Sequence, residues 1–394
     1  MAELNIVVIG TGMYATGRGT DGYGTVLPAI VEWKRTGADL GRVIFVGTNG
    51  NNAHSVEDKF RNLELDTGVH LNAEVFPQGE IKSPSLYKKY LAEVPYPACA
   101  IVVVPDHLHF EVVKECLLNK MPVLVVKPLT PKISEAKELI RFASEQKTYG
   151  AVEFHKRWDK ANLMLKDAIT QNRIGEMLYV WVEYSQRKSI PTEIFREWSS
   201  RSSILQYLGI HYVDIVLFYT NAKPLRTMAV GQKTWLTKHG IDTWDSIQCT
   251  IEWEMPSGAK FVQTLLTNWI DPETTTAMSD QKIKIVGTEG RLESDQKSRG
   301  IKIITDGVCA EEPNPDFCMP YVSSSDNIEW KGYGIDSITS FLDDVSGLLK
   351  NETTLEYLNC IRPVFSQGLI STAVIEAAHK SLLDSNSWKD ICLD

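Results

Sequence analysis

The sequence predicts an α/β protein: an N-terminal, doubly wound parallel sheet followed by an α+β domain with a mostly antiparallel, open sheet. Three observations predict it. Short apolar runs alternate with helical patterns over the first 150 residues, a glycine-rich turn follows the first run, and the later chain carries long strand-like runs joined by tight turns. We therefore divide the 394 residues into a first domain, 1–150, and a second domain, 151–394.

The first domain contains four short apolar runs that each end at glycine or proline or just before one. Such runs are typical of strands buried on both faces of a parallel sheet. Helical patterns with one apolar side lie between and after them. The expected strands are 4–9, 43–46, 100–104 and 123–126, and the expected helices are 110–119 and 134–146.

The second domain opens with a predicted helix near 160–170. Met255-Pro256-Ser257-Gly258 and Gly287-Thr288-Glu289 are tight turns between strand-like runs, which favours antiparallel pairing. A further helix is expected at about 368–383. The expected strands are 177–185, 227–235, 246–255, 260–269, 282–286 and 290–294.

Composition excludes several classes of partner. With 41 basic and 50 acidic residues the formal charge is −9, which argues against a nucleic-acid surface. No run reaches the length needed to span a bilayer, and the N-terminus, MAELNIVVIG, does not read as a secretory signal, so we expect a cytoplasmic protein. The odd number and wide spacing of the cysteines predict reduced thiols and no metal site: Cys99, Cys116, Cys249, Cys309, Cys318, Cys360 and Cys392.

A phosphate-binding turn follows the first predicted strand. It reads Gly10-Thr11-Gly12-Met13-Tyr14-Ala15, a G-x-G-x-x-A pattern. Gly10 allows the tight turn, Gly12 lets the backbone approach a pyrophosphate, and Ala15 permits close packing. The pattern predicts a Rossmann dinucleotide-binding domain over 1–150, with Gly10, Gly12, Met13 and Tyr14 at the cofactor.

Residues 17–24 are too rich in glycine for a helix interior. The helix after the turn is therefore expected to begin near Thr25 or Val26, with Pro28 in its first turn. This insert is either a flap over the cofactor or a solvated loop.

The end of the second predicted strand distinguishes NAD from NADP. An acidic residue there would bind the 2′-hydroxyl of the adenosine ribose and repel a 2′-phosphate. The positions read Gly47-Thr48-Asn49-Gly50-Asn51, with no acid, and no arginine follows directly. Thr48 and Asn49 are able to donate hydrogen bonds to a phosphate. NADP is favoured, and NAD remains open.

Five further segments, in this order, resemble the glucose–fructose oxidoreductase and inositol dehydrogenase (Gfo/Idh/MocA) family. The resemblance covers nearly the whole chain. The segments are Val103-Val104-Pro105-Asp106-His107-Leu108-His109, Val125-Val126-Lys127-Pro128-Leu129-Thr130, Phe154-His155-Lys156-Arg157-Trp158-Asp159-Lys160-Ala161, Leu208-Gly209-Ile210-His211-Tyr212-Val213-Asp214 and Ile285-Val286-Gly287-Thr288-Glu289-Gly290.

The resemblance implies hydride transfer between a nicotinamide and a sugar, cyclitol or related polyol. It places Pro105 and His109 near the nicotinamide ribose, and Lys127 and Pro128 in the family's Glu-Lys-Pro-Leu-Thr motif. It also implies that 151–394 binds substrate and forms a homodimer or homotetramer through its open sheet.

Three residues are the candidate catalytic groups. Oxidation of an alcohol needs a proton acceptor, and the resemblance assigns that role to His211. Lys127 would polarise the substrate oxygen. Two positions depart from the family pattern: Val126 replaces the glutamate of the motif, and Tyr207 replaces an aspartate found four residues before the histidine. A tyrosine is able to donate a hydrogen bond and relay a proton.

The expected substrate contacts are Lys127, His155, Arg157, Tyr184, Arg187, Tyr207 and His211. Their basic members suggest an anionic substrate such as a uronate, a sugar phosphate or a nucleotide sugar. Tryptophans of the second domain are candidates for stacking on a sugar face: Trp198, Trp235, Trp244 and Trp269.

Two alternatives to a dehydrogenase remain open. The same scaffold with a tightly held cofactor could cleave or epimerise a sugar with no net redox change. Alternatively, the protein could be a non-catalytic, dinucleotide-binding regulator.

Overall fold

The computed structural model describes residues 3–307, 310–324 and 327–393. The chain forms two compact units, each assembled from segments that are distant in sequence. Unit 1 comprises Met1–Leu129, Ser134–Trp158 and Asp316–Ser366. Unit 2 comprises Thr130–Ile133, Asp159–Pro315 and Gln367–Asp394.

Unit 1 is built on a six-stranded parallel sheet in the order β3-β2-β1-β4-β5-β6, the strand order of Rossmann folds. It confirms the predicted fold of the N-terminal part. The sequence did not predict β3 or β6, each only four residues long. The strands are β1 (Leu4–Ile9), β2 (Leu40–Val46), β3 (Ala73–Phe76), β4 (Ala98–Val102), β5 (Val123–Val126) and β6 (Gly150–Glu153).

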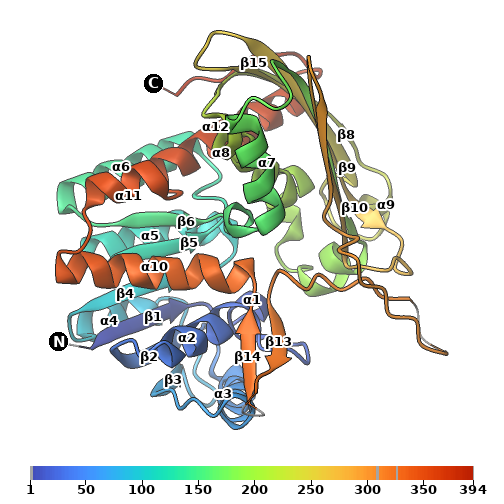
Figure 1. Ribbon diagram of the computed structural model, residues 1–394. Coiled ribbons are helices and arrows are strands. Elements are labelled where there is room, and N and C mark those ends of the chain that lie inside the picture. The colour runs from blue at the N-terminus through green and yellow to red at the C-terminus, as the bar shows by residue number, and fades with distance from the viewer. Residues whose placement is uncertain (1–2, 308–309, 325–326, 394) are drawn as a thin grey trace. The chain divides into compact units, whose positions relative to one another are not determined.

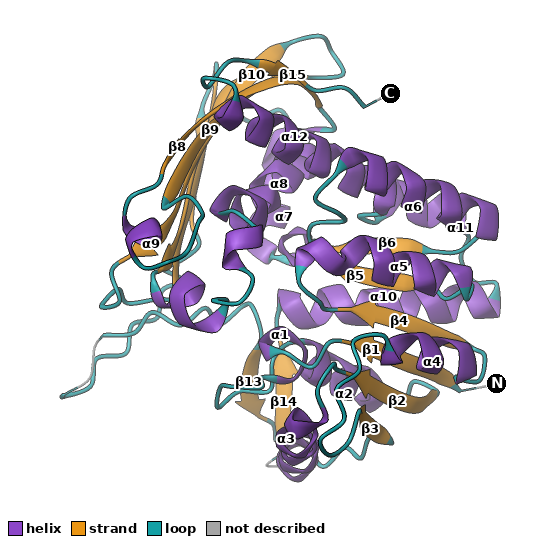
Figure 2. Ribbon diagram, turned by 180° about the vertical axis from the view of Figure 1, so that it is seen from behind, coloured by secondary structure: helices purple, strands orange, loops and turns teal. Residues whose placement is uncertain are grey.

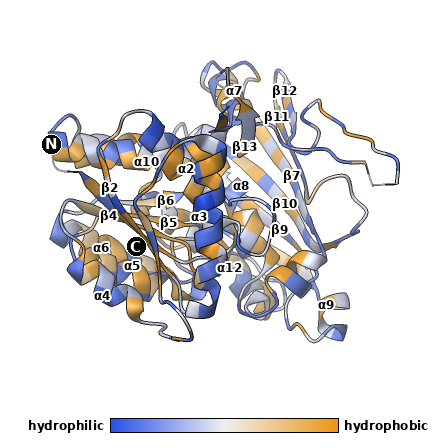
Figure 3. Ribbon diagram, turned by 90° about the horizontal axis from the view of Figure 1, so that it is seen from below, coloured by the Kyte–Doolittle hydropathy of each residue, from blue (hydrophilic) through white to orange (hydrophobic). Residues whose placement is uncertain are grey.

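Helices cover both faces of this sheet, which explains why its central strands are buried throughout. Helices α2 and α10 lie on one face, and α4, α5 and α6 on the other (Figures 1 and 2). Hydrophilic and hydrophobic residues are both visible along α2 and α3 (Figure 3), as expected for helices with one buried side. The helices are α1 (Met13–Thr16), α2 (Val26–Arg35), α3 (Ala53–Thr67), α4 (Leu86–Glu93), α5 (His109–Leu118), α6 (Ile133–Gln146), α10 (Tyr333–Lys350) and α11 (Leu355–Ile361).

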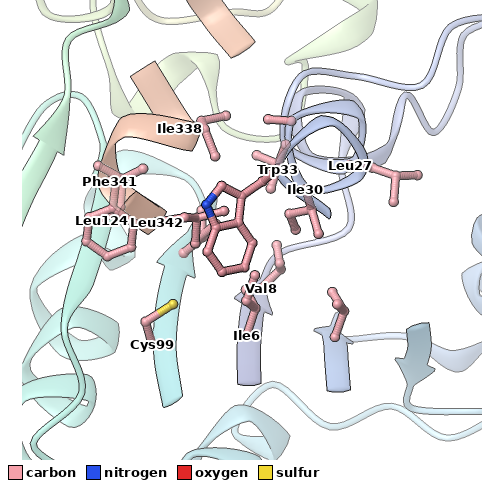
Figure 4. Packing of buried hydrophobic residues seen from close by; sticks show 14 of the residues in the cluster. Ile6, Val8, Leu27, Ile30, Trp33, Cys99, Leu124, Ile338, Phe341 and Leu342 are labelled. Atoms are coloured by element: carbon pink, nitrogen blue, oxygen red, sulfur yellow. The ribbon is translucent and has the colours of Figure 1, made fainter. Parts of the chain in front are cut away.

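The core of unit 1 forms around Trp33 of α2, which is 2% exposed. Its ring lies among side chains from β1 and α10, including Ile6 and Ile338 (Figure 4). Its indole Nε1 donates to Asp343 Oδ1 of α10 at 2.8 Å. Because α10 shares this core, residues 316–366 belong to unit 1, and the predicted assignment of all of 151–394 to the second domain differs from the structure here.

Unit 2 contains a seven-stranded sheet in the order β12-β11-β7-β10-β9-β8-β15. Only the β7–β10 pair is parallel, which confirms a mostly antiparallel sheet. The turn at 255–258 joins β9 to β10 as predicted. The strands are β7 (Met177–Arg187), β8 (Lys223–Gln232), β9 (Ser246–Glu254), β10 (Lys260–Asp271), β11 (Ser279–Gly287), β12 (Arg291–Asp295) and β15 (Lys389–Asp390).

One face of the unit 2 sheet packs on helices and the other is more exposed. Along β9, buried and half-buried residues alternate, as expected for a strand covered on one side. Gln263 of β10 donates to the Tyr212 carbonyl of α8 at 2.9 Å, and the Ala229 amide of β8 donates to Ser381 Oγ of α12 at 3.0 Å. The helices are α7 (Lys160–Thr170), α8 (Ile210–Thr220), α9 (Trp235–Lys238) and α12 (Phe365–Leu383).

Three smaller features complete the description. Strand β8 ends at Gln232 rather than at the predicted residue 235, because Trp235 begins α9. In unit 1, β13 (Met319–Val322) pairs antiparallel with β14 (Ile328–Lys331). π-helical turns occupy Ile190–Ile194 and Leu205–Gly209, the second directly before α8.

The described cysteines carry free thiols, and burial raises the pKa of those at Cys99 and Cys116. Cys309 lies outside the described residues. In the part of the chain that the structure describes, no helix has the length and apolar character needed to cross a membrane.

Candidate functional site

The glycine turn after β1 has the geometry that dinucleotide binding needs. Gly10 has φ +116°, and a Cβ there would lie 2.0 Å from the Val103 carbonyl oxygen, so only glycine fits. At Gly12, by contrast, no atom lies within 4 Å of an added Cβ. The open space beside Gly12 lets a pyrophosphate approach the backbone, and the turn therefore fits the predicted cofactor.

The glycine-rich insert, residues 17–24, forms a loop that hydrogen bonds hold in place. One helical turn, α1, which the sequence did not predict, ends at Gly17 in the left-handed conformation, and α2 begins at Val26 as predicted. Lys59 of α3 donates to the carbonyls of Thr20 at 2.7 Å and Asp21 at 3.1 Å. Residues 19–22 are exposed, and the Lys59 bonds hold the insert against α3.

The segment after β2 is also ordered by backbone contacts. The Thr48 carbonyl accepts from the Ser83 amide at 2.9 Å, and Thr48 is exposed. Asn49 Oδ1 accepts from the Asn51 amide at 3.1 Å. This bond leaves the Asn49 NH₂ group as the part of the side chain that is able to donate to a ligand.

Lys127 follows β5 and is half-buried. Burial lowers the pKa of Lys127 to about 7, whereas the nearby carboxylates of Asp106 and Glu153 favour its charged form. The ammonium and the neutral amine are therefore both populated near neutral pH, which suits a group that donates and accepts protons.

His109 lies between two backbone carbonyls near Lys127, and its neutral imidazole is able to donate to one of them. Its Nδ1 lies 2.6 Å from the Pro128 carbonyl oxygen, and its Nε2 lies 2.9 Å from the Val104 carbonyl oxygen. The residue is 0% exposed, and burial lowers its pKa. His109 therefore positions the Lys127–Pro128 turn. Because His109 is fully buried, its exposure gives no support to the predicted contact with the cofactor. Pro105, the other predicted contact in this segment, is half-exposed.

A buried carboxylate lies at the end of β6. Glu153 is 2% exposed, accepts from Ser337 Oγ of α10 at 2.8 Å and lies 3.0 Å from His155 Nδ1. The His155 ring stacks near Tyr14 and Tyr333, with centroids 6.4 and 5.7 Å away. Burial, and then Glu153, raise the pKa of Tyr14 well above its usual value, so its phenol stays protonated.

The basic segment His155-Lys156-Arg157 belongs to unit 1, although the predicted boundary at residue 150 placed it in the second domain. It forms a 3₁₀ turn, His155–Trp158, that contacts α10, where the Trp158 indole donates to Ser340 Oγ at 2.9 Å. Arg157 is only 6% exposed, and its guanidinium carbon lies 6.0 Å from the Phe154 ring centroid. Substrate contacts from His155 and Arg157 stay predictions.

In unit 2 the structure brings Tyr184 and His211 together. His211 lies in the first turn of α8, is 3% exposed, and has its ring 6.5 Å from that of Tyr184. Tyr207, in the preceding π-helical turn, packs instead among aromatic rings, 5.1 Å from Phe195 and 5.8 Å from Trp198. π-helical turns are often found at functional sites.

Two other predicted contacts have structural roles. Arg187 ends β7 and donates from Nε to Thr275 Oγ1 at 3.2 Å and from Nη2 to the Thr275 carbonyl, so it fixes the loop between β10 and β11. Trp269 is 0% exposed and donates to Gln186 Oε1 at 3.1 Å, which makes it a core residue unable to stack on a sugar.

Two family models match the chain. One, an oxidoreductase family with an NAD-binding Rossmann fold, matches residues 4–154, and the other, the GFO/IDH/MocA C-terminal domain, matches residues 162–293. The chain belongs to the Gfo/Idh/MocA family of oxidoreductases.

Characterised relatives match this Gfo/Idh/MocA chain over part of their length. An inositol 2-dehydrogenase of Rubrobacter xylanophilus is 25% identical over 37% of this chain and 40% of its own. The scyllo-inositol 2-dehydrogenase (NADP(+)) IolW of Bacillus subtilis is 28% identical over 31% of this chain and 35% of its own. The alignments thus span well under two thirds of these relatives.

Solved structures of the family share the whole fold. The myo-inositol 2-dehydrogenase of Lactobacillus plantarum has a TM-score of 0.69 at 14% identity and covers 99% of this chain and 100% of its own. The scyllo-inositol dehydrogenase of Lactobacillus casei, solved with NAD(H) and scyllo-inositol, has a TM-score of 0.67 at 13% identity and covers 99% of both chains.

The structure adds two acids to the candidate site of this Gfo/Idh/MocA protein. Asp106 lay in a motif that the sequence analysis quoted without giving it a role, and it is 5% exposed. Glu153 was missed because the predicted boundary at 150 cut through its strand, although an acid directly after an apolar run is a usable signal. No three histidine, cysteine or acidic side chains within the described ranges are grouped so that they could hold a metal ion.

Proposed function

We propose that this protein is an NAD(P)-dependent oxidoreductase that transfers hydride between a nicotinamide and a hydroxyl or keto carbon of a sugar, sugar derivative or cyclitol. The observation that carries the proposal is Lys127, whose pKa lies at about 7 and which follows a strand of the same parallel sheet as the glycine turn. In such sheets, ligands bind at the carboxyl ends of the strands.

Unit 1 supplies the residues that would hold the cofactor. The backbone from Gly10 to Tyr14 would hold the pyrophosphate. The adenosine ribose would contact Thr48 and Asn49. The nicotinamide end would contact Pro105, Lys127 and Pro128. When bound, the nicotinamide accepts or supplies the hydride. Because no acid follows β2, we favour NADP over NAD.

Lys127 and His211 are the proposed proton-transfer groups. The Lys127 ammonium donates to the substrate oxygen during carbonyl reduction, and its neutral amine accepts a proton during alcohol oxidation. His211 belongs to unit 2, and its part in this proton transfer rests on the family resemblance. Tyr184 and Tyr207 are proposed as substrate contacts because their hydroxyls are able to bond a polyol.

The substrate class is supported by the names of the relatives, which include inositol dehydrogenases and a 1,5-anhydro-D-fructose reductase of Ensifer adhaerens. An anionic substrate stays a prediction with less support, because Arg187 is engaged by Thr275. Assembly as a homodimer or homotetramer through the half-exposed face of the unit 2 sheet is also proposed.

The test measures binding first and turnover second. Thermal shifts with NAD, NADP and a panel of cyclitols and sugars identify ligands, since binding to the folded state raises Tm. With the best pair, Lys127→Met and His211→Ala should each lower kcat at least ~100-fold and still bind the cofactor. Lys88→Met, an exposed lysine paired with Glu115, is the control and should change neither.

Unchanged turnover in either variant would remove that residue from the mechanism. Turnover by dialysed protein without added nicotinamide would instead favour the redox-neutral alternative. Cofactor binding without turnover on any polyol would favour the regulator.

A further inference from the structure

We propose that Arg18 selects NADP(H) over NAD(H) by binding the 2′-phosphate of the adenosine ribose. The inference rests on the proposed function and adds a specificity residue to it. It begins from one contact: Arg18 Nη1, on the glycine-rich loop, donates to Thr11 Oγ1 at 3.2 Å.

That contact brings the guanidinium close to the end of β2. A Cβ added to Gly47, the first residue after β2, would lie 2.8 Å from Thr11 Oγ1 and 3.3 Å from Thr11 Cγ2. The Thr11 hydroxyl is therefore close both to Arg18 Nη1 and to the strand end where Rossmann folds bind the ribose hydroxyls. Arg18 thus reaches the position at which the 2′-substituent is recognised.

Hydrogen bonds order the loop that carries Arg18. Thr20 closes a turn over Arg18, because both its amide and its hydroxyl donate to the Gly17 carbonyl, at 2.9 and 2.8 Å. Lys59 then fixes the Thr20 and Asp21 carbonyls to α3. Arg18 itself is half-buried, so part of the entropy cost of ordering its long side chain is met before a ligand binds.

The charges near this position match a phosphate. Residues 47–52 contain no acid. This segment therefore has no carboxylate that would repel a 2′-phosphate or accept a hydrogen bond from a 2′-hydroxyl. A guanidinium is planar and matches two phosphate oxygens at once. The sequence analysis looked for an arginine directly after β2 and found none; the glycine-rich insert supplies one from the other side of the glycine turn.

The pyrophosphate is the rival target for Arg18, because Thr11 belongs to the turn that would hold it. The two targets predict different results. A contact with the pyrophosphate weakens NAD and NADP equally, whereas a contact with the 2′-phosphate weakens NADP alone.

The experiment measures dissociation constants by calorimetry on the cofactor-free protein, without any turnover. The probes are NADP, NAD, ADP-ribose and its 2′-phosphate. We expect Arg18→Gln to weaken both 2′-phosphorylated probes at least ~10-fold and the other two less than ~3-fold. Arg18→Lys keeps the charge and loses the planar fork, and should lie between wild type and Arg18→Gln. Arg61→Gln, an exposed arginine of α3 paired with Asp58, is the matched control and should change nothing.

Equal losses on all four probes, or no loss on any, would overturn the assignment of Arg18. If wild-type protein binds none of the four probes, the proposed function fails and the inference fails with it. If wild type binds NAD far better than NADP, only the inference fails. Melting curves of each variant show that an altered affinity does not come from unfolding.

Discussion

Glu153 of β6 lies directly beside Val126 of β5 in the parallel pairing of these two strands. Residues paired in this way project from the same face of a sheet. A carboxylate is therefore present here on the strand beside position 126, at which the Gfo/Idh/MocA motif carries its glutamate. It is held there by Ser337 Oγ at 2.8 Å and lies 3.0 Å from His155 Nδ1.

Glu153→Gln should shift the pH dependence of turnover. Glu153 favours the charged form of Lys127, so its loss lowers the Lys127 pKa further below about 7. If carbonyl reduction needs the ammonium, the fall of kcat/KM with rising pH should begin at lower pH in the variant than in wild type. Glutamine keeps an oxygen for Ser337, which protects the fold. Glu138→Gln, which changes a surface ion pair with Lys114, is the control. If the pH profile of Glu153→Gln shifts to higher pH or does not shift, Glu153 does not influence the pKa of Lys127.

Lys127→Met should stabilise the cofactor-free protein at neutral pH. The Lys127 pKa falls from 10.5 to about 7 on folding, so between these values the unfolded chain binds more protons. The cost of burying this lysine is thus largest below pH 7 and is relieved as the pH rises toward 10.5. We expect a Tm a few degrees above wild type at pH 7, since ~1 kcal/mol moves Tm by about 2–4 °C in a larger domain. The gap should close by pH 10, and a gap of equal size at both pH values would argue against this cause.

Gly10→Ala and Gly12→Ala should fail in different ways. An alanine at Gly10 meets the Val103 carbonyl at 2.0 Å in a backbone with φ +116°, and should cost about 2 kcal/mol or more in the free energy of unfolding. An alanine at Gly12 meets no atom within 4 Å and should leave stability nearly unchanged. Its methyl group would occupy the space for the pyrophosphate and should weaken NAD(P) binding ~10-fold or more. Urea melts measure the effect on stability, and calorimetry measures the effect on cofactor affinity. Normal cofactor affinity in Gly12→Ala would show that the pyrophosphate does not bind at this turn.

His109→Leu should reduce both stability and turnover. The change removes the imidazole N–H that donates to the carbonyl of Val104 or of Pro128, and an unpaired buried group costs about 1–3 kcal/mol. Because Pro128 follows Lys127 directly, the ammonium loses its fixed position and kcat should fall while KM for the cofactor changes little. His109→Gln, which keeps a donor, should recover part of both losses. Normal kcat in a destabilised His109→Leu protein would limit the residue to a packing role.

Local patterns predicted much of the fold. The apolar runs at β1 and β5 and the helical pattern of α7 coincide with the observed elements, because each buries a continuous apolar face or stripe. β3 was missed because Glu74 and its half-exposed neighbours give it no continuous apolar run. The sequence analysis placed the residues of α10 in the second domain. Only the contacts of α10 with Trp33 and α2 show that its apolar side belongs to the core of unit 1.

The sequence by itself determined the glycine turn, Lys127 and the motif order that identifies the family. These features depend on residue type and spacing within a few positions, and each residue there has one dominant physical role. The tertiary structure alone decided that Glu153 lies beside Val126, that His109 contacts the carbonyl of Pro128 next to Lys127, and that Arg18 contacts Thr11 of the glycine turn. Each of these relationships joins positions on different strands or loops, so it exists only once the chain has folded.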